Sequence, residues 1–498
     1  MKTLHEVQPI KKRREATTFQ VAESNFTLFI FGASGSLAKL KLFPALYELQ
    51  KEKRMPADYK IVGYARTPMT DEAFRKFFEA SIRKSEKFVD ERALSDLLKN
   101  VSYFTGQYDQ EADYRKFLKY LREHEKSKNR VRMAYFSVPP MAFPDIFKNL
   151  GAVNFDTKKA PLRLVIEKPF GTNYRSAKKL KKTLERRFKP EQIYLLDHYL
   201  GKEAVSNLLS LRYANSILTT LMHSDYVSNI QISALEKKDI EGRANYFDHV
   251  GIIRDMVQSH LFQILAYLTM FAPRERNSEA IHHEKARVLE SIRIHDIKNS
   301  IVRGQYKNYK KEKGIAPESQ TETFAAIKLT MKHPLWKNVP IYIRSGKCLN
   351  QKWTGVVIEY KPRWAQKELP ALPPNKIVIQ LQPTEKIEFH LFTKLGGKTF
   401  DFHPLTTGRP IYCSGDCLVE HGRLLLDVVA GKQGLFLNFE EIFSAWRIVD
   451  PLQKLCEKWQ RKKKNLHIYQ RNTLGPKAAD ELIQKDGFQW YAERSAAQ

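Results

Sequence analysis

The sequence predicts two domains: a doubly wound α/β domain and, after it, an α+β domain with a large, mainly antiparallel sheet. The chain has 498 residues, more than a single hydrophobic core normally holds. Apolar runs alternate with charged, helix-periodic stretches as far as residue 196, which is typical of βαβ units. Beyond residue 199 the segments alternate polar and apolar side chains, which is typical of antiparallel strands.

Five apolar runs in the first domain indicate buried parallel strands. They cover residues 26–31, 59–64, 132–138, 163–166 and 192–196. Helices are expected between them, for example over residues 37–50 and 71–85. Because parallel strands need crossover connections, residues 26–196 are expected to form a sheet covered by helices on both faces. Residues 1–25 are basic and polar, and we expect a flexible tail there.

The second domain is expected to span residues 197–498. Its strand-like segments cover residues 227–234, 324–330, 339–344, 356–360 and 377–382. Two long amphipathic stretches, residues 251–271 and 440–459, predict helices that pack on this sheet.

The charge balance indicates an affinity for anions. Lysine and arginine number 84 against 55 acidic residues, a net charge of +29. Such a field attracts phosphorylated metabolites, dinucleotides and nucleic acid alike. The basic clusters at residues 11–14, 178–182 and 461–464 carry no helix-turn-helix, zinc-finger or ribonucleoprotein signature. We therefore expect solvated basic faces and no specific nucleic-acid partner.

Cysteine usage and hydropathy predict a cytoplasmic protein without a metal or a membrane segment. Cys348, Cys413, Cys417 and Cys456 are too few and too scattered for a disulfide framework. Cys413 and Cys417 lack the second pair or the histidine cluster that a zinc site requires. The first 24 residues hold no apolar core of a signal peptide, and no apolar run is long enough to span a bilayer.

A loop of small residues follows the first strand, in the order Gly32-Ala33-Ser34-Gly35-Ser36-Leu37-Ala38. Small residues let the backbone turn tightly and let the first amides of a helix approach a pyrophosphate, as in Rossmann-like domains. Only some of the expected glycines are present, so a purely structural turn explains the loop almost as well.

The second strand ends at Arg66, where an NAD enzyme places a carboxylate for the ribose 2′-hydroxyl. A guanidinium pairs with a 2′-phosphate, which a carboxylate would repel. Arg66 therefore favours NADP, with a surface arginine near a strand end as the alternative.

Two further strands end in polar groups at the edge where open α/β sheets bind ligands. One is followed by Glu167-Lys168-Pro169-Phe170-Gly171 and the other by the donor-rich segment 197–203. His198, Tyr199 and Lys202 offer the converging donors and the cation that a sugar phosphate needs.

His260 lies on the apolar face of the expected helix 251–271. A lone histidine there is usually a buried structural residue, but the oxidation of an alcohol needs a base near neutral pKa. Asp255 lies five residues earlier and so is not on the same face of an ideal α-helix. The carboxylate that orients His260 is therefore expected to come from another element.

Together these motifs resemble those of glucose-6-phosphate dehydrogenases from the Gly32 loop to Gly475-Pro476. The specific part is the combination of residues 167–171, 197–203 and 254–260, since the Glu-Lys-Pro triplet alone also occurs in other two-domain sugar dehydrogenases. The resemblance implies oxidation of glucose 6-phosphate by NADP, the first oxidative step of the pentose phosphate pathway. It also implies a homodimer or tetramer formed through the sheet of the second domain.

The same resemblance implies the roles of single residues. His260 is the general base, Asp197 orients it and stabilises its imidazolium form, and Lys168 lies between sugar and nicotinamide. The coenzyme residues implied are Gly32, Ser34, Gly35, Ser36, Leu37, Arg66, Tyr135 and Lys168. The substrate residues implied are Lys168, His198, Tyr199 and Lys202, then Glu236 and Asp255 for sugar hydroxyls, and also Lys347, Lys352 and Gln382.

The sequence departs from the family pattern at three places. Ser36 stands where the family has Asp near the nicotinamide, which bears on coenzyme selectivity, and Ser259 replaces the usual Asn before the catalytic His. Trp353, Thr354 and Gln380 are neutral where animal-type members hold a second, structural NADP with basic residues. We therefore expect no second NADP site.

Two alternatives stay open from the sequence. One is a related hexose or hexose-phosphate dehydrogenase with a different sugar or with NAD. The other is a binding or sensory protein that has kept the fold and lost turnover, against which the joint presence of Lys168, Asp197 and His260 argues.

Overall fold

The computed structural model describes residues 21–240, 242–275, 277–362, 372–394, 402–410 and 418–491. Most of the expected N-terminal tail and the pair Cys413 and Cys417 lie outside these residues. Two compact units are present. Unit 1 comprises Met1–Val138, Val153–Leu162 and Cys413–Gly431, and unit 2 comprises Pro139–Ala152, Arg163–Tyr412 and Lys432–Gln498.

The parallel sheet has six strands in the order β3-β2-β1-β4-β5-β6. Its strands are β1 Phe26–Phe31, β2 Tyr59–Ala65, β3 Val101–Thr105, β4 Val131–Phe136, β5 Leu162–Glu167 and β6 Ile193–Leu196. Every residue of β1 and β4 is buried, as expected for strands covered on both faces. In this order β1 lies between β2 and β4, the arrangement of a Rossmann-like fold, and the predicted fold class is confirmed.

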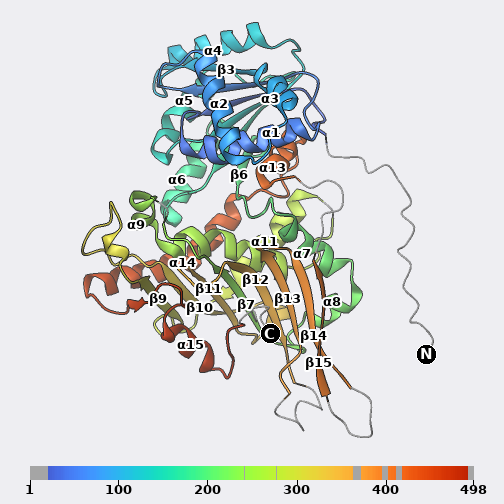
Figure 1. Ribbon diagram of the computed structural model, residues 1–498, viewed down its shortest axis with the longest axis vertical. Coiled ribbons are helices and arrows are strands. Elements are labelled where there is room, and N and C mark those ends of the chain that lie inside the picture. The colour runs from blue at the N-terminus through green and yellow to red at the C-terminus, as the bar shows by residue number, and fades with distance from the viewer. Residues whose placement is uncertain are drawn as a thin grey trace, which may run out of the picture. The chain divides into compact units, whose positions relative to one another are not determined.

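Helices connect these strands (Figure 1). They are η1 Ala38–Leu42, α1 Phe43–Lys51, α2 Asp71–Ser85, α3 Glu91–Leu98, α4 Glu111–His124, α5 Phe143–Ala152 and α6 Tyr174–Glu185. The start of α2 is fixed by Thr70, whose side chain accepts a hydrogen bond from the amide of Ala73. The helix expected over residues 37–50 is formed by η1, a short π-helix, together with α1. Helices α5 and α6 belong to unit 2, whereas α13 Glu420–Ala430 belongs to unit 1, although it comes late in the chain.

Unit 2 contains a ten-stranded sheet with the order β15-β14-β13-β12-β7-β11-β10-β9-β16, in which β8 pairs with β10. The strands are β7 Val227–Leu235, β8 Ile292–Arg293, β9 Ile301–Tyr306, β10 Phe324–Met331, β11 Ile341–Gly346, β12 Trp353–Tyr360, β13 Lys376–Gln382, β14 Lys386–Lys394, β15 Phe402–Pro410 and β16 His467–Tyr469. The pairs β7–β11 and β9–β16 are parallel and the other pairs are antiparallel, which confirms the mainly antiparallel sheet.

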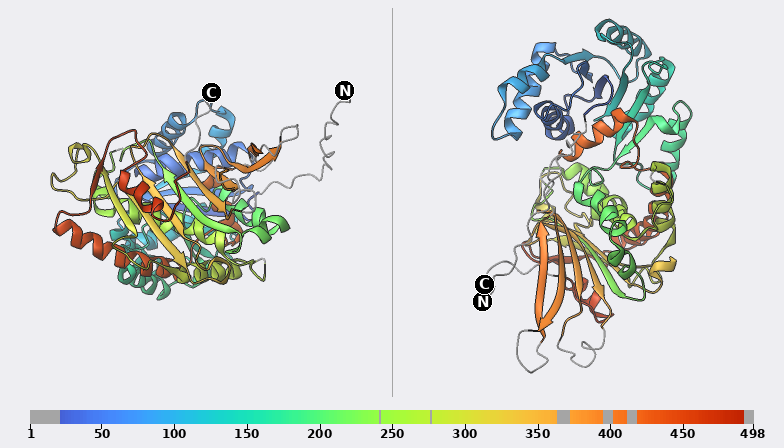
Figure 2. Two further views of the ribbon diagram at one scale, coloured as in Figure 1. Left: turned by 90° about the horizontal axis from the view of Figure 1, so that it is seen from below. Right: turned by 90° about the vertical axis from the view of Figure 1, so that its right-hand side faces the viewer.

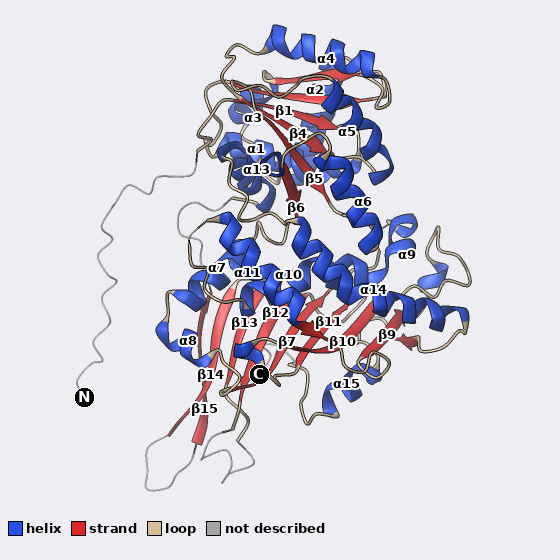
Figure 3. Ribbon diagram, turned by 180° about the vertical axis from the view of Figure 1, so that it is seen from behind, coloured by secondary structure: helices blue, strands red, loops and turns tan. Residues whose placement is uncertain are grey.

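Besides α5 and α6, unit 2 contains further helices, one of which carries His260. They are α7 Glu203–Tyr213, α8 Ser216–Leu221, α9 Ala244–Ile252, η4 Ile253–Leu261, α10 Phe262–Thr269, α11 Ser278–Ser291, α14 Phe439–Arg461 and α15 Lys477–Gln484. The π-helix η4 packs on β7 and β11, and α11 packs on both α10 and α14. Helices and sheet form two layers (Figures 2 and 3). In the part of the chain that is described, no helix combines the length and apolarity needed to cross a bilayer.

The helix predicted over residues 251–271 is present as η4 and α10, which together cover Ile253–Thr269. Gly251 has φ 69° and ψ 166°, which no right-handed helix contains, so α9 is kinked at this residue, where the predicted helix begins. A Cβ atom on this residue would lie 2.4 Å from Oε1 of Glu322. Only glycine fits both requirements. The kink is followed by a π-helix, in which the backbone bonds span five residues instead of four.

Candidate active site

The catalytic candidates come from three segments of unit 2. Lys168 directly follows β5, Asp197 directly follows β6, and His260 lies on η4. The carboxyl ends of neighbouring parallel strands meet at one edge of a sheet, so β5 and β6 bring Lys168 and Asp197 to the same edge. The structure thus unites three residues that lie far apart in the sequence.

The π-helix decides how Asp255 and His260 lie relative to each other. In an ideal α-helix these two residues, five positions apart, would not lie on the same face. One turn of a π-helix holds more residues, and both side chains reach the ammonium group of Lys168. The expectation that they diverge was therefore wrong. The expectation that another element supplies the carboxylate on the His260 ring is confirmed, since that carboxylate is Asp197.

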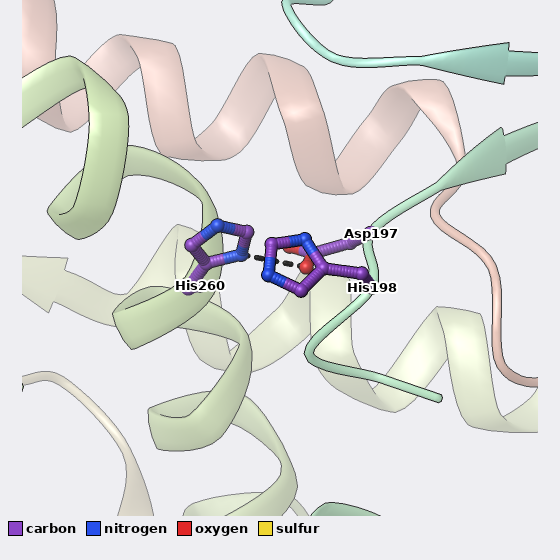
Figure 4. Close-up of side chains that lie close together, drawn as sticks. All are labelled: Asp197, His198 and His260. Carbon is purple, nitrogen blue, oxygen red and sulfur yellow. Dashed lines mark hydrogen bonds and ion pairs between the residues drawn. The ribbon is translucent and has the colours of Figure 1, made fainter. Parts of the chain in front are cut away.

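Asp197 and His260 form a fully buried pair (Figure 4). Nδ1 of His260 lies 2.6 Å from Oδ1 of Asp197, and both side chains are only 1% exposed. The same oxygen accepts a hydrogen bond of 2.9 Å from the amide of Tyr199. A carboxylate accepts and does not donate, so Nδ1 carries the proton. The lone pair of the neutral ring is therefore on Nε2.

Lys168 occupies the position in front of that lone pair. Its Nζ lies 2.7 Å from Nε2 of His260, 2.8 Å from the carbonyl oxygen of Asp255 and 3.2 Å from Oδ1 of Asp255. All three partners accept hydrogen bonds, which matches the three donors of an ammonium group. Lys168 is thus charged, and His260 is neutral.

The pKa shifts agree with these protonation states. Burial lowers the pKa of His260 by more than the charge of Asp197 raises it. Burial also disfavours the charge on Lys168, but the neighbouring carboxylates, Asp255 first, outweigh it and raise the pKa of Lys168. Burial opposes ionisation of Asp197 and Asp255, yet His260 and Lys168 lower the pKa of Asp197, and Lys168 and Lys347 lower that of Asp255 to about 2.

Aromatic rings pack against the imidazole of the dyad. The ring of Tyr199 stacks on His260 at a centroid distance of 4.1 Å and an angle of 17°. His198 meets His260 edge-on at 4.8 Å, and Nζ of Lys202 lies 5.4 Å from the centre of the Tyr199 ring. The structure therefore brings together the imidazole, the phenol and the ammonium predicted to bind a phosphate.

The remaining candidates for the substrate divide into two groups. Lys347 is buried next to β11, and its ammonium forms an ion pair with the half-exposed carboxylate of Glu236. Lys347 also stabilises the ionised form of Asp255. Lys352 is exposed and Gln382 is half-buried at the end of β13, and neither is among the described contacts of the dyad.

The glycine loop of unit 1 has the close approach that a dinucleotide site requires. Gly32 has φ 80°, and a Cβ atom there would lie 2.4 Å from the carbonyl oxygen of Ser137. Its amide donates to the carbonyl of Tyr64 at 2.9 Å, which holds the turn against β2. Ser34 and Ser36 are exposed where the helix begins. This narrow turn of small residues at a helix start fits a pyrophosphate.

Arg66 stands exposed directly after β2, in the position expected for a 2′-phosphate partner. Its guanidinium lies 5.4 Å from the centre of the Tyr108 ring. The sequence analysis did not name Tyr108, because it follows β3, a strand that the apolar runs did not mark. Tyr135, by contrast, is completely buried in the middle of β4. Its predicted place along the coenzyme cleft stays a prediction.

Asp197, His198 and His260 also present ligand atoms within 4.8 Å of one another, close enough to be compared with a metal site. Both ring nitrogens of His260 already have partners, Asp197 at Nδ1 and Lys168 at Nε2. The cation of this cluster is therefore an ammonium group of the chain itself. Cys348 and Cys456 are free and buried, and Cys413 and Cys417 lie outside the described residues.

Comparisons with known proteins identify the family of the chain. Residues 29–207 match the family model for the NAD binding domain of glucose-6-phosphate dehydrogenase, and residues 209–491 match the model for its C-terminal domain. The glucose-6-phosphate 1-dehydrogenase of Buchnera aphidicola is 34% identical over 93% of this chain and 97% of its own length.

Solved structures give the same result. A glucose-6-phosphate dehydrogenase in complex with its substrate glucose-6-phosphate has a TM-score of 0.87 at 31% identity, covering 96% of this chain and 100% of that one. The glucose-6-phosphate 1-dehydrogenase of Mycobacterium avium has a TM-score of 0.84 at 29% identity, covering 94% and 98%. The chain belongs to the glucose-6-phosphate dehydrogenase family.

Proposed function

We propose that the chain oxidises glucose 6-phosphate at C1 with NADP and releases 6-phosphogluconolactone and NADPH. The observation that carries this proposal is the state of His260, a neutral imidazole whose Nδ1 is held by Asp197 and whose Nε2 faces a charged lysine. A base in this state accepts a proton from an alcohol. The membership of the chain in the glucose-6-phosphate dehydrogenase family agrees with this reaction.

The proton of the C1 hydroxyl passes to Nε2 of His260. As the proton leaves the oxygen, the electron pair of the C1–H bond departs as a hydride, and a carbonyl group forms at C1. NADP supplies the acceptor for that hydride. The imidazolium that results is stabilised by the carboxylate of Asp197 at 2.6 Å, which needs no reorganisation because it is already in place.

Lys168 keeps Nε2 hydrogen-bonded until substrate arrives, and its three acceptors fix it there. A C1 hydroxyl that binds between Lys168 and His260 accepts a hydrogen bond from Lys168 and donates one to Nε2 of His260. Lys168 thus orients the hydroxyl and favours the developing negative charge on its oxygen.

The phosphate is bound by His198, Tyr199 and Lys202. Tyr199 stacks on His260, His198 meets His260 edge-on, and Lys202 lies over the ring of Tyr199, so all three lie close to the base. Glu236 and Asp255 accept hydrogen bonds from sugar hydroxyls, and Lys347, already paired with Glu236, aligns that carboxylate. Lys352 and Gln382 complete the substrate set by family resemblance.

For the coenzyme, the amides of the Gly32 loop bind the pyrophosphate and Arg66 pairs with the 2′-phosphate. Ser34, Gly35, Ser36 and Leu37 surround the same turn, and Tyr135 and Lys168 belong to the set by resemblance. Serine at position 36 removes the carboxylate expected near the nicotinamide, which bears on the choice between NADP and NAD.

We further propose a coenzyme domain over residues 26–196, and a substrate and dimerisation domain over residues 197–498. Self-association through the sheet of unit 2 is supported by its terminal strand pair, where Leu391 and Leu405 are 41% and 42% exposed. Sedimentation equilibrium counts the subunits. Residence in the cytoplasm is in keeping with two buried free thiols and is tested by cell fractionation.

The decisive experiment is the initial rate of NADPH formation from glucose 6-phosphate, from unphosphorylated glucose and from other hexose phosphates, with NADP and with NAD. We expect glucose 6-phosphate with NADP to give the highest kcat/KM. A higher value with another sugar or with NAD would replace the proposed substrate or coenzyme, and no turnover with any pair would refute the enzymatic function.

A further inference from the structure

A second buried charged cluster, which the proposed mechanism does not use, lies between α11 and α14 of unit 2. Nδ1 of His282 is 2.7 Å from Oε1 of Glu441, and Nζ of Lys285 is 3.0 Å from Oε2 of Glu441. The side chains of Lys285 and Glu441 have no exposed surface. We call His282, Lys285 and Glu441 the brace cluster.

Burying such charges is costly, and an apolar replacement of similar volume is often as stable. The brace cluster therefore calls for an explanation beyond stability. Its contacts lead to the dyad from two sides.

The first contact leads to the helix of His260. Nζ of Lys285 donates to Oε1 of Gln263 at 3.3 Å and lies 5.0 Å from the centre of the Tyr267 ring. Gln263 is buried on α10, three residues after His260, where the π-helix passes into α10. Lys285 is thus attached to the turn that follows the base.

The second contact leads to the strand of Asp197. Nε2 of His282 lies 3.1 Å from the carbonyl oxygen of Gln433, whose side chain donates to the carbonyls of Pro190 and Ile193, each at 3.0 Å. A little further on, the amide of Leu437 donates to the carbonyl of Leu195 at 2.9 Å. These bonds hold β6, the strand that ends directly before Asp197.

The charge of Lys285 acts on the dyad as well. Burial lowers the pKa of Lys285, but Glu441 first and also Asp197 raise it, so Asp197 and Lys285 stabilise each other's charged forms. The other ionisable and charged groups around the dyad come from every neighbouring segment. They are Lys168 after β5, His198 and Tyr199 after β6, Tyr246 on α9, Asp255 on η4, Glu236 and Lys347 beside β7 and β11, and Glu441 on α14.

We propose that the brace cluster positions the Asp197–His260 dyad, and that Lys285 is the member that acts on it, through Gln263 and through its charge. Lys285 is a positioning residue, because it does not touch the reacting atoms. The inference rests on the roles proposed above for Asp197 and His260.

Removal of the ammonium should move the pH profile in a defined direction. A positive charge near the dyad disfavours a second positive charge on His260, so its loss favours the imidazolium form. We expect the apparent pKa of the acid limb in the pH profile of kcat/KM to rise by roughly half a unit to one unit. We also expect kcat at neutral pH to fall about 5- to 50-fold, with KM for glucose 6-phosphate nearly unchanged.

The test uses Lys285→Met, which removes the ammonium and leaves the carboxylate of Glu441 paired with His282. Its matched control is Arg132→Met, which removes the cation of a buried ion pair of unit 1, in which Arg132 and Glu125 lie 2.5 Å apart with 5% exposure at each side chain. Thermal unfolding and full pH profiles are recorded for both. Both variants should lose stability, and only the first should move the acid limb.

A first variant that loses stability as the control does, yet keeps the wild-type acid limb and kcat, would overturn the proposal. Gln263→Leu is the second variant. It removes the hydrogen bond between Lys285 and residue 263 but keeps the charges of Lys285 and Glu441, and it should lower kcat without moving the acid limb.

His260→Asn in the same assay separates the proposed role of the base from the proposed role of the brace cluster. If this variant keeps full activity, the proposed base is wrong, whereas if it is inactive and the brace variants behave as wild type, only the brace inference fails.

Discussion

At the scale of single residues, the chemistry depends on which nitrogen of His260 holds its proton. The carboxylate of Asp197 at 2.6 Å assigns that proton to Nδ1, and burial keeps the ring neutral. In the proposed mechanism the ring therefore meets the substrate as a base, with its lone pair directed at the position of Lys168. This assignment makes Asp197 important for the tautomer and for the transition state alike.

Asp197→Asn should lower kcat by roughly 10²- to 10⁴-fold and leave KM for glucose 6-phosphate within a few-fold of wild type. The amide keeps the size of the side chain but cannot stabilise the imidazolium, which forms only as the reaction proceeds. Steady-state kinetics of the purified variant measures both constants. A change in KM alone would show that Asp197 serves binding and is not paired with the base.

Arg66→Ala should weaken NADP by roughly 10- to 100-fold and NAD very little, because only NADP carries the 2′-phosphate. The exposed position of Arg66 leaves room for that phosphate, and its removal disturbs no buried contact. Fluorescence titration with each coenzyme gives the two dissociation constants. Equal losses for both coenzymes would leave Arg66 with a structural role.

At the scale of elements, the backbone around η4 determines whether Asp255 and His260 can reach the same ammonium group. Helix α9 is kinked at Gly251, and the π-helix that follows α9 widens the turn enough to place both side chains on Lys168. The proposed mechanism thus depends on a local departure from the regular α-helix.

Gly251→Ala should destabilise the protein by about 1–3 kcal/mol and lower kcat, because the new Cβ lies 2.4 Å from Oε1 of Glu322 at a positive φ. The matched control is Gly242→Ala, where φ is similarly positive at 74° but nothing lies within 4 Å of the added atom. Urea unfolding and kcat are compared for the two. Equal effects on kcat would mean that the kink at Gly251 does not position His260.

Apolar runs were enough to locate most of the strands and both sheets. The strand β1 and the helix α2 begin and end where the sequence placed them, since every residue of β1 is apolar or small and Thr70 caps α2. The π-helix could not be predicted, because α- and π-helices differ in backbone hydrogen bonds and not in the apolar pattern. Strand β3 was missed because its last residues are partly exposed, and Tyr108 was missed with it.

The sequence also located part of the candidate site and missed the rest. Lys168 and Asp197 were found because each stands directly after a buried strand, and the family resemblance assigned their roles. The brace cluster was not found, since His282, Lys285 and Glu441 lie in helices where charged residues normally face solvent. Only the packing of α11 on α14 buries them.

At the scale of the whole molecule, a net charge of +29 makes the chain attractive to anions, but tight binding needs converging partners. In the second sheet, Nε1 of Trp353 donates to Oε1 of Gln380 at 3.0 Å, and Gln380 in turn donates to Thr384. Trp353 and Gln380 are each 2% exposed. Their polar atoms are already paired and carry no charge for a second dinucleotide.

We therefore expect one NADP per subunit. Calorimetric titration of the coenzyme-free protein gives the number of sites, and Arg66→Ala serves as the variant with a weakened first site. Thermal stabilisation by NADP should decrease in parallel with affinity in that variant. A second tight site, or stabilisation that Arg66→Ala leaves intact, would contradict this expectation.

The base assigned to His260 is tested most directly by the pH dependence of kcat/KM for NADPH formation from glucose 6-phosphate, measured for the wild type and for His260→Asn. Because burial lowers the pKa of His260 from 6.5, the neutral base persists through neutral pH, and the wild-type rate should fall only as the pH drops below 6.5. His260→Asn should be slower by roughly 10²- to 10⁴-fold and should lack that acid limb. A variant that keeps the wild-type rate and the wild-type acid limb would contradict the account.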